Sequence, residues 1–172
     1  MDDKKRAILD EIPRLRRYAR ALLHDREAAD DLVHDGLERA LSQLDDWQSG
    51  ESPRQWLLTI IHSLFIDRKR RPARRGEELP PPHEMAEGTV PPPARFESAM
   101  SRELFEALQA IAPERREALL LVAVEGLTYG DAASVLGIPT ETLLSRIAAA
   151  REELRASLDD AARRRMIRIV EK

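Results

Sequence analysis

Residues 126–147 constrain the fold of this chain more than any other stretch, because they specify two short helices and the turn between them. Thr128 is placed to cap the first helix, and Gly137 supplies the left-handed residue that ends it. The second helix follows a proline and turns an apolar side back onto the first helix, through Leu143 and Ile147. This layout predicts a helix-turn-helix.

The other side of the second helix carries polar and cationic residues. In a helix-turn-helix the second helix enters the major groove of DNA, where such residues meet base edges and phosphates. The residues expected on that side are Thr142, Ser145, Arg146 and Ala149. The same pattern also fits an ordinary helical hairpin with a glycine in its turn, because short motifs produce false matches.

The composition limits the classes to which the chain can belong. Of its 172 residues, 34% are charged, 4% are aromatic and none is cysteine. Such a composition suits small helical units and excludes disulfides, thiol catalysis and cysteine-based zinc sites. No run of about 18 apolar residues occurs, and the first residues lack the apolar core of a signal peptide. We therefore expect a cytoplasmic protein without membrane insertion.

No pattern in the sequence predicts catalysis. The four histidines lack metal-ligand spacing, and neither a nucleophile elbow nor a phosphate-binding glycine loop occurs. Adjacent acids such as Asp30 and Asp31 diverge on a helix, so they suit neither a carboxylate dyad nor a metal cage. We expect the protein not to be an enzyme and to need no metal or cofactor.

The net charge of −3 conceals a strongly cationic stretch, with six cations and one acid between residues 67 and 75. The distribution of charge, rather than its sum, sets the local field that a nucleic acid meets. The stretch therefore predicts contacts with phosphates, and the alternative is a solvated run of charges.

The N-terminal part of the chain has the pattern of three amphipathic helices. Apolar residues recur at steps of three and four over residues 8–23, 27–44 and 53–71. We expect the first helix to bend or begin near Pro13 and the third to stop at Pro72. The outer face of the second helix is acidic, which is typical of a solvated face or of a surface that docks a basic partner.

The expected fold class is all-α, with two small helical domains joined by a Pro-rich acidic linker and a helix-turn-helix in the C-terminal domain. Residues 1–75 form the first domain, and residues 76–97 form a flexible linker, because that segment cannot bury enough apolar surface to order itself. Residues 98–158 form the second domain. Residues 159–172 form a basic tail of open role, with another short amphipathic helix as one possibility.

This order of parts resembles the bacterial extracytoplasmic-function (ECF) RNA polymerase sigma factors, group IV of the sigma-70 superfamily. The resemblance covers residues 8–71 and 101–158. It rests on Asp31-Leu32-Val33-His34-Asp35, on the Trp-bearing loop and the helix that ends in Ile66-Asp67-Arg68, and on residues 127–139 before Ser145-Arg146-Ile147. It implies that the chain directs core RNA polymerase to specific promoters.

The resemblance assigns two functions to the first domain. Its acidic helix would bind the β′ clamp helices of core polymerase, and an acidic face with apolar flanks suits a basic helical hairpin. The residues concerned are Asp30, Asp31, Leu32, Val33, His34 and Asp35. The following loop and helix would melt the −10 element, where loop donors surround an unstacked base and cations hold phosphates. These residues are Trp47, Gln48, Ser49, Gly50, Ser52, Arg54, Arg68, Lys69, Arg70 and Arg71.

The same resemblance assigns recognition of the −35 element to the second domain. The residues concerned are Thr140, Glu141, Thr142, Ser145, Arg146 and Ala149. The sequence departs from the family at Leu144, where Lys or Met is common, and at Ala148 and Ala149, where more basic residues are common. We therefore expect weak phosphate anchoring there. The implied partners are core polymerase through its β′ and β subunits, promoter DNA and an anti-sigma factor, with the chain itself a monomer.

Two other functions stay open at the level of sequence. A sigma-like decoy would bind an anti-sigma factor without acting on DNA, and the cation-poor second helix of the helix-turn-helix keeps that alternative. A conventional dimeric regulator would bind paired half-sites one helical turn apart without polymerase.

Overall fold

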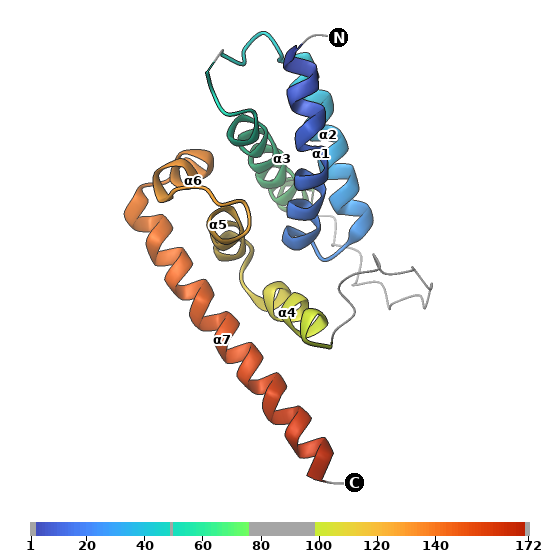
Figure 1. Ribbon diagram of the computed structural model, residues 1–172, viewed down its shortest axis with the longest axis vertical. Coiled ribbons are helices and arrows are strands. Elements are labelled where there is room, and N and C mark those ends of the chain that lie inside the picture. The colour runs from blue at the N-terminus through green and yellow to red at the C-terminus, as the bar shows by residue number, and fades with distance from the viewer. Residues whose placement is uncertain (1–2, 49, 76–98, 171–172) are drawn as a thin grey trace.

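The computed structural model describes residues 3–48, 50–75 and 99–170, and within these ranges the chain forms seven α-helices and no strand. Figure 1 shows α1 to α3 packed side by side, with α5 between them and the long α7. The helices are α1 (Asp3–Leu22), α2 (Arg26–Ser42), α3 (Pro53–Arg75), α4 (Ala99–Ala110), α5 (Pro113–Ala123), α6 (Tyr129–Leu136) and α7 (Thr140–Val170). The all-α prediction is confirmed.

Helices α1 to α3 form the first lobe. Asp25 caps α2, since its carboxylate accepts from the Glu27 backbone N–H at 2.9 Å. Gly36 lets α2 approach α3 closely, because a Cβ at that position would lie 2.4 Å from Cδ1 of Ile61. The apolar faces predicted from the sequence are buried in the lobe, including Ile8, Leu15, Leu22, Leu32, Leu57 and Ile61.

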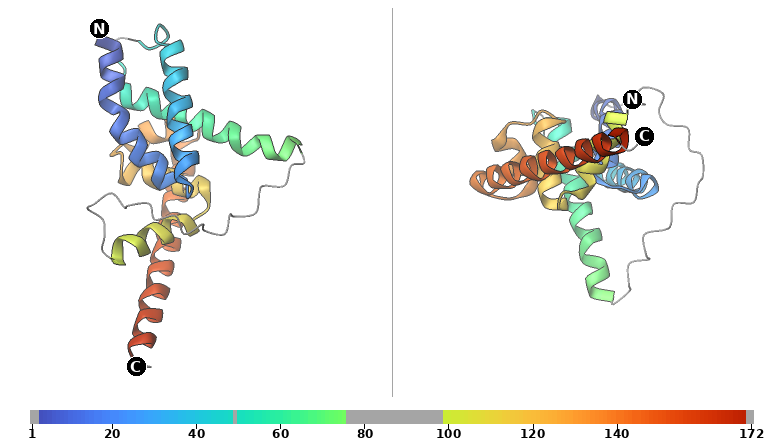
Figure 2. Two further views of the ribbon diagram at one scale, coloured as in Figure 1. Left: turned by 90° about the vertical axis from the view of Figure 1, so that its right-hand side faces the viewer. Right: turned by 90° about the horizontal axis from the view of Figure 1, so that it is seen from below.

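Two prolines lie inside helices of the first lobe, where the sequence predicted a bend or a start at Pro13 and a stop at Pro72. Helix α1 begins at Asp3 and continues through Pro13, and α3 continues through Pro72 to Arg75 rather than stopping at residue 71. A proline inside a helix removes one N–H donor, and the hydrogen bonds of the flanking turns keep the rest of the helix in place. As a result α3 is longer than predicted, and Figure 2 shows its C-terminal half projecting from the bundle.

Helices α4 to α7 form the second lobe and contain the predicted helix-turn-helix. The Thr128 hydroxyl caps α6 by accepting from Asp131 N–H at 3.1 Å, and Gly137 ends the helix with a φ of 63°. Leu143 and Ile147 are buried against α6 as predicted. The basic tail does not form a separate helix, because α7 runs unbroken for 31 residues through residue 170.

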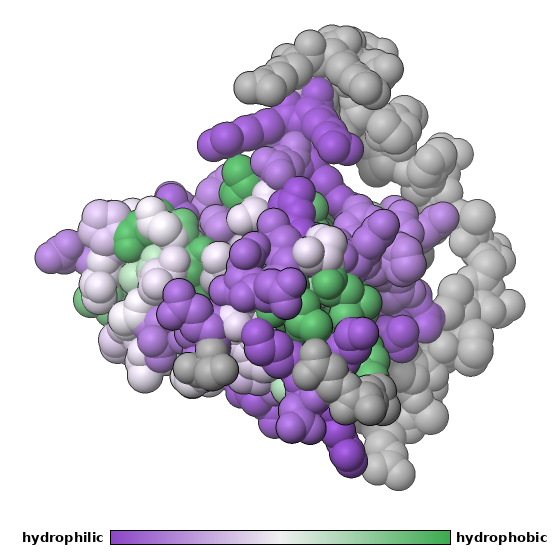
Figure 3. All heavy atoms as spheres, turned by 90° about the horizontal axis from the view of Figure 1, so that it is seen from above, coloured by the Kyte–Doolittle hydropathy of each residue, from purple (hydrophilic) through white to green (hydrophobic). Residues whose placement is uncertain are grey.

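The two lobes pack directly against each other. Helix α6 lies against α3, and α1 contacts both α4 and α5, so the buried apolar residues of the two lobes form one continuous cluster. The sequence predicted two domains joined by a linker and gave no sign of this packing, and the predicted linker at residues 76–97 lies outside the described residues. Viewed from above, the surface is mostly hydrophilic with small hydrophobic patches (Figure 3).

Candidate nucleic-acid and polymerase interfaces

The acidic face of α2 borders a groove between α1 and α2. The groove has a volume of about 420 Å³ and is lined by Arg16, Arg20, Asp30, Asp31, Val33, His34 and Leu37. Its walls carry both signs of charge, and the Arg20 guanidinium lies 3.4 Å from Asp30. The surface therefore suits a helical partner that carries both basic and acidic side chains.

The six residues predicted to dock polymerase differ in their exposure in the structure. Asp30, Asp31 and His34 are exposed, whereas Leu32 is fully buried and Val33 is 3% exposed. The helical period turns Leu32 inward, so it holds α2 in place and offers no surface to a partner. Asp35 is partly covered and faces a neighbouring helix rather than the groove.

Asp35 pairs with a residue predicted to contact DNA. The Arg68 guanidinium lies 2.6 Å from the Asp35 carboxylate and also donates to the Ala28 carbonyl at 3.2 Å. The ion pair joins α3 to α2, and the two contacts together use two of the five N–H donors of Arg68. The contact therefore joins Asp35, which was predicted to dock core polymerase, to Arg68, which was predicted to bind phosphate.

The remaining cations at the end of α3 are more accessible. Arg70 and Arg71 are exposed on the projecting part of the helix shown in Figure 2. Lys69 lies over the Phe65 ring and pairs with Glu114 of the second lobe. This pairing lowers the pKa of Glu114. The cations of α3 therefore form both a surface that suits phosphates and a contact with the other lobe.

The loop before α3 is built on two tryptophans. Trp47 is 8% exposed and stacks on Trp56 with ring centroids 5.7 Å apart. Its indole N–H donates to the Glu51 carbonyl at 3.2 Å, and Lys4 lies over its ring. Trp47 was predicted to contact DNA, and the packing of this large ring leaves little of it exposed to meet a base.

Other loop residues predicted to contact DNA lie at the surface. Gln48, Gly50 and Ser52 are exposed, and Gly50 has a φ of 109° that favours glycine. Ser49 lies outside the described residues. Arg54 is partly covered, because its guanidinium donates to Glu11 of α1 at 3.1 Å. The exposed loop residues are therefore supported from below by the buried Trp47 and the partly buried Trp56.

The recognition face of α7, formed by residues 140–149, is exposed and carries little positive charge. Thr140, Glu141, Thr142, Leu144, Ser145 and Ala148 are exposed on it. Arg146 is only partly exposed and lies near enough to Glu114 to lower the pKa of that carboxyl. Ala149 is also partly covered. The face therefore offers hydroxyls, one carboxylate and apolar groups to a partner.

Sequence reasoning missed the charged residues between the lobes. Arg116, Glu117 and Glu125 are 7%, 1% and 8% exposed. Burial raises the pKa of Glu125 and lowers the pKa of Arg116. The helical period could have indicated the burial of Glu117, because this residue lies three and four residues before the buried Leu120 and Leu121 and so on the same face of α5.

Within the described ranges, no group of three or more His, Cys, Asp or Glu side chains is arranged to hold a metal ion. None of the helices in those ranges combines the length and apolarity needed to cross a bilayer.

Two family models match the chain, one in each lobe. The Sigma2 domain of PhyR matches residues 8–62, and the model described as Sigma-70, region 4 matches residues 101–154. Their order along the chain follows the order of the two lobes. The charged end of α3 and the last part of α7 lie beyond the matched ranges.

Relatives with assigned functions extend the likeness over nearly the whole chain. The ECF RNA polymerase sigma factor EcfG of Rhodopseudomonas palustris (strain TIE-1) is 34% identical over 157 residues, which cover 91% of this chain and 86% of that protein. The ECF RNA polymerase sigma factor SigC of Mycobacterium tuberculosis (strain CDC 1551 / Oshkosh) is 34% identical over 145 residues, with coverages of 81% and 75%.

A solved structure shares the arrangement of both lobes. The sigma factor RpoE, determined in complex with the anti-sigma factor NepR from Bartonella quintana, aligns with a TM-score of 0.78 at 29% identity. The alignment covers 92% of this chain and 98% of that one. The close packing of the lobes is thus similar to that of a sigma factor bound to its partner.

Proposed function

The chain belongs to the ECF RNA polymerase sigma factors, which give polymerase its recognition of promoters, and we propose which of its surfaces perform each step. In this proposal the α2 groove docks core polymerase, the loop and end of α3 melt the −10 element, and the recognition face of α7 locates the −35 element. The observation that carries the proposal is the 34% identity to EcfG, spread over 91% of the chain and both lobes.

Core docking uses the exposed half of the predicted α2 surface. Asp30, Asp31 and His34 border the groove and are free of the packing that buries Leu32. Complementary charge raises the rate of association with a basic helical hairpin, such as the β′ clamp helices of the polymerase. Arg16 and Arg20 on the opposite wall select for a hairpin that also carries acidic residues.

Promoter melting uses the loop and the cationic end of α3. Arg70 and Arg71 hold phosphates, and the exposed loop around Gly50 surrounds a base that has left the stack. The paired tryptophans keep the loop in shape. Binding to single-stranded DNA supplies the free energy of melting, so this step requires no catalytic residue.

Recognition of the −35 element uses the first turns of α7. The residues proposed to contact it are Thr140, Glu141, Thr142, Ser145, Arg146 and Ala149. Hydroxyls accept or donate at several base edges, and a carboxylate accepts from the amino group of cytosine. Because the face has few cations, its binding depends on being joined to the first lobe.

An anti-sigma factor is the proposed regulatory partner. The RpoE structure was determined with NepR bound, and this chain shares its arrangement at a TM-score of 0.78. A protein of that kind would hold the lobes together and cover the surfaces needed for polymerase and promoter.

A sigma-like decoy is the second candidate, and the composition of the recognition face favours it. Leu144 and Ala148 are exposed where phosphate-binding cations would help, and Arg146 is partly covered. Such a protein would bind an anti-sigma factor and would not bind DNA.

Transcription with purified components separates the two candidates. The full chain is added to core polymerase and fragmented genomic DNA of its source, and the transcripts are mapped by sequencing. The sigma function predicts discrete start sites with a shared upstream motif. Stable binding to an anti-sigma factor without binding to core polymerase would establish the decoy instead.

A further inference from the structure

The segment that connects α2 to α3 lies beside the first turn of α1, as Figure 1 shows. This segment, residues 43–52, is called the −10 loop below, because its exposed part is proposed to surround an unstacked base. The promoter contacts predicted from the sequence begin at Trp47. The start of α1 was therefore given no part in promoter melting, although it contacts the loop.

Lys4 of α1 binds the −10 loop at three points. Its ammonium donates to the carbonyl of Leu44 at 3.1 Å and to the carbonyl of Trp47 at 2.9 Å. It also lies over the Trp47 ring, 5.9 Å from the centroid. Hydrogen bonds from a charged donor are stronger than those between neutral groups. One side chain therefore fixes both the backbone of the loop and the orientation of its buried ring.

From Trp47 the contacts continue to the exposed part of the loop. The Trp47 indole N–H donates to the Glu51 carbonyl at 3.2 Å, and the Glu51 backbone N–H donates to the Gln48 carbonyl at 3.2 Å. The Trp47 ring also stacks on Trp56 of α3. The position of this ring thus sets the path of the exposed backbone, and Lys4 holds the ring from the side of α1.

The place of Lys4 in α1 is explained by the loop rather than by the helix. Lys4 lies in the first turn of α1, where the helix dipole disfavours a cation. The carbonyls that it reaches lie just beyond the C-terminal end of α2, where a cation is favoured. The partly buried side chain therefore stabilises the contact between the two helix ends more than it stabilises α1.

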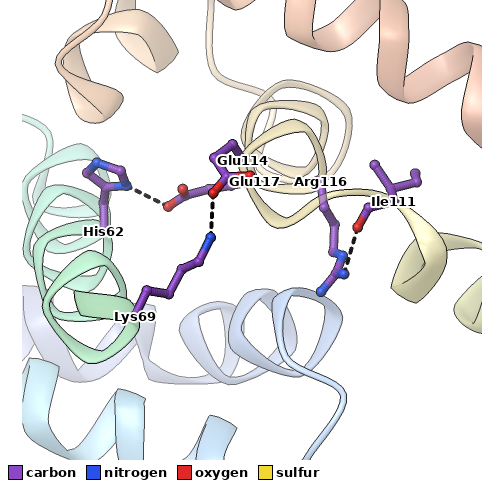
Figure 4. Close-up of polar contacts among 6 residues, drawn as sticks. All are labelled: His62, Lys69, Ile111, Glu114, Arg116 and Glu117. Carbon is purple, nitrogen blue, oxygen red and sulfur yellow. Dashed lines mark hydrogen bonds and ion pairs between the residues drawn. The ribbon is translucent and has the colours of Figure 1, made fainter. Parts of the chain in front are cut away.

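Other cations of the first lobe are engaged away from the −10 loop. Lys69 turns toward Glu114 of the second lobe (Figure 4), and Arg54 donates to Glu11. Residues 68–71 follow the start of α3 by 15 residues or more, which is roughly 23 Å along the helix. The loop itself contains three acids and no cation. Among the described residues, Lys4 is thus the cation that binds the loop carbonyls.

We propose that Lys4 is a positioning residue for promoter melting, which holds Trp47 and the loop backbone in the shape that receives an unstacked base. The proposal rests on the proposed function of the loop at the −10 element. A loop already held in its binding shape loses less conformational freedom when it binds, so a larger fraction of the chain is competent. Because the ammonium is bound to carbonyls of the loop, Lys4 acts through the loop and not through a phosphate.

Lys4→Met tests the proposal, because methionine keeps most of the side-chain length and removes the ammonium. The full chain in complex with core polymerase is titrated with fork DNA that carries a single-stranded −10 element. We expect affinity to fall about five- to tenfold, as the fraction of competent loops falls by that factor. The slope of log affinity against log salt should stay the same, because no phosphate contact is lost.

Abasic sites in the DNA distinguish loss of base capture from a general loss of binding. With the unmodified chain, an abasic site at the captured position of the −10 element should weaken binding by about tenfold. With Lys4→Met the same abasic site should weaken binding less than about twofold further, because the altered loop no longer captures that base. Testing each −10 position in turn identifies the captured base.

Lys5→Met is the matched control, since it removes the same charge from the next residue of α1, which is exposed. It should bind fork DNA within about twofold of the unmodified chain. Lys4→Arg keeps the cation and should restore affinity to within about threefold. The only two tryptophans of the sequence form the stack, so fluorescence of the free chain reports on the loop. Emission should move to longer wavelength in Lys4→Met and stay unchanged in Lys5→Met.

Three outcomes would overturn the proposal: an unchanged affinity of Lys4→Met for fork DNA, an equal loss in Lys5→Met, or a shallower salt slope in Lys4→Met. Loss of core binding in Lys4→Met would also contradict it, because the α2 groove begins at Arg16, about 18 Å further along α1. The proposed function of the loop would fail separately if no abasic site in the −10 element weakened binding of the unmodified chain.

Discussion

The two surfaces proposed to meet DNA differ in what they present to it. The end of α3 carries four consecutive cations at residues 68–71 and projects from the bundle (Figure 2). The recognition face of α7 presents hydroxyls, the carboxylate of Glu141 and the apolar Leu144, and its Arg146 is partly covered. One surface is suited to phosphates and the other to base edges.

This difference separates affinity from specificity within one small chain. Phosphate contacts position a protein on DNA without reading its sequence, whereas base-edge contacts discriminate and bind weakly without cations nearby. A weak contact gains effective concentration when it is joined to a stronger one. On the promoter, the first lobe would therefore contribute most of the binding free energy, and the second lobe would contribute most of the sequence preference.

Of the changes considered, removing the exposed cations of α3 should lower the affinity for DNA most. For Arg70→Gln with Arg71→Gln we expect affinity for fork DNA to fall about 10- to 100-fold on every sequence. The slope of log affinity against log salt should also become shallower by roughly 0.7 to 0.9 for each lost phosphate contact. Fluorescence anisotropy at several salt concentrations measures both quantities.

The tail of α7 offers a matched control for that change. Arg163 and Arg164 are exposed cations on a helix, and Arg163→Gln with Arg164→Gln removes the same charge far from both proposed DNA surfaces. Equal losses of affinity in the two double variants would mean that net charge, rather than the α3 surface, governs binding.

The local signals of the sequence predicted the helix-turn-helix well. Thr128 and Gly137 act within a few residues of the positions they fix, so cap and turn chemistry identified both ends of α6. The proline signals were weaker, because tertiary packing and neighbouring hydrogen bonds carry α1 through Pro13 and α3 through Pro72. The full length of α7 was also missed, since the second domain was predicted to end at residue 158 and the helix continues through the basic tail to residue 170.

Contacts between distant residues were beyond the sequence pattern. Trp47 was assigned to DNA, yet the structure covers its ring with Trp56 and Lys4. Arg68 and Asp35 were assigned to different partners, yet they pair with each other at 2.6 Å. Such pairings depend on how three helices meet, which periodicity within one helix does not specify.

Changing Arg146 should sharpen the proposed role of the recognition face. Arg146→Ala should lower transcription from preferred promoters by about tenfold and relax the preference at one position of the −35 element, since a good base contact contributes roughly 1–3 kcal/mol. Selection from a library with a randomised −35 element measures the preference. Arg151→Ala, an exposed cation further along α7, is the control and should leave the preferred motif unchanged.

The buried Glu125 of the second lobe should make the stability of the fold depend on pH. Burial raises the pKa of Glu125, and Arg54 and Arg17 of the first lobe only partly oppose this. The folded chain therefore holds this proton more tightly than the unfolded chain, so the residue destabilises the fold at neutral pH. The penalty shrinks as pH falls through the raised pKa and is gone below the ordinary value of 4.5.

Glu125→Gln should remove this pH-dependent penalty. We expect Tm to rise by roughly 2–4 °C at pH 7.5, as about 1 kcal/mol gives in a chain of this size, and to change little at pH 4. Differential scanning calorimetry at both values of pH measures the effect. A Tm that falls at pH 7.5 would indicate that the Glu125 carboxylate forms a favourable ion pair with Arg54 or Arg17 instead.

The smallest effect is expected at Arg68, where the cationic surface meets the polymerase-docking helix. Its guanidinium is already bound to Asp35 and to the Ala28 carbonyl, so Arg68→Gln should lower affinity for fork DNA by less than about threefold. Asp35→Asn releases the guanidinium and should raise that affinity about twofold. The double variant should bind DNA like Arg68→Gln alone, because the gain from Asp35→Asn requires the freed cation. Additive effects of the two changes would show that the pair does not restrain Arg68, and that all four cations of α3 act alike on DNA.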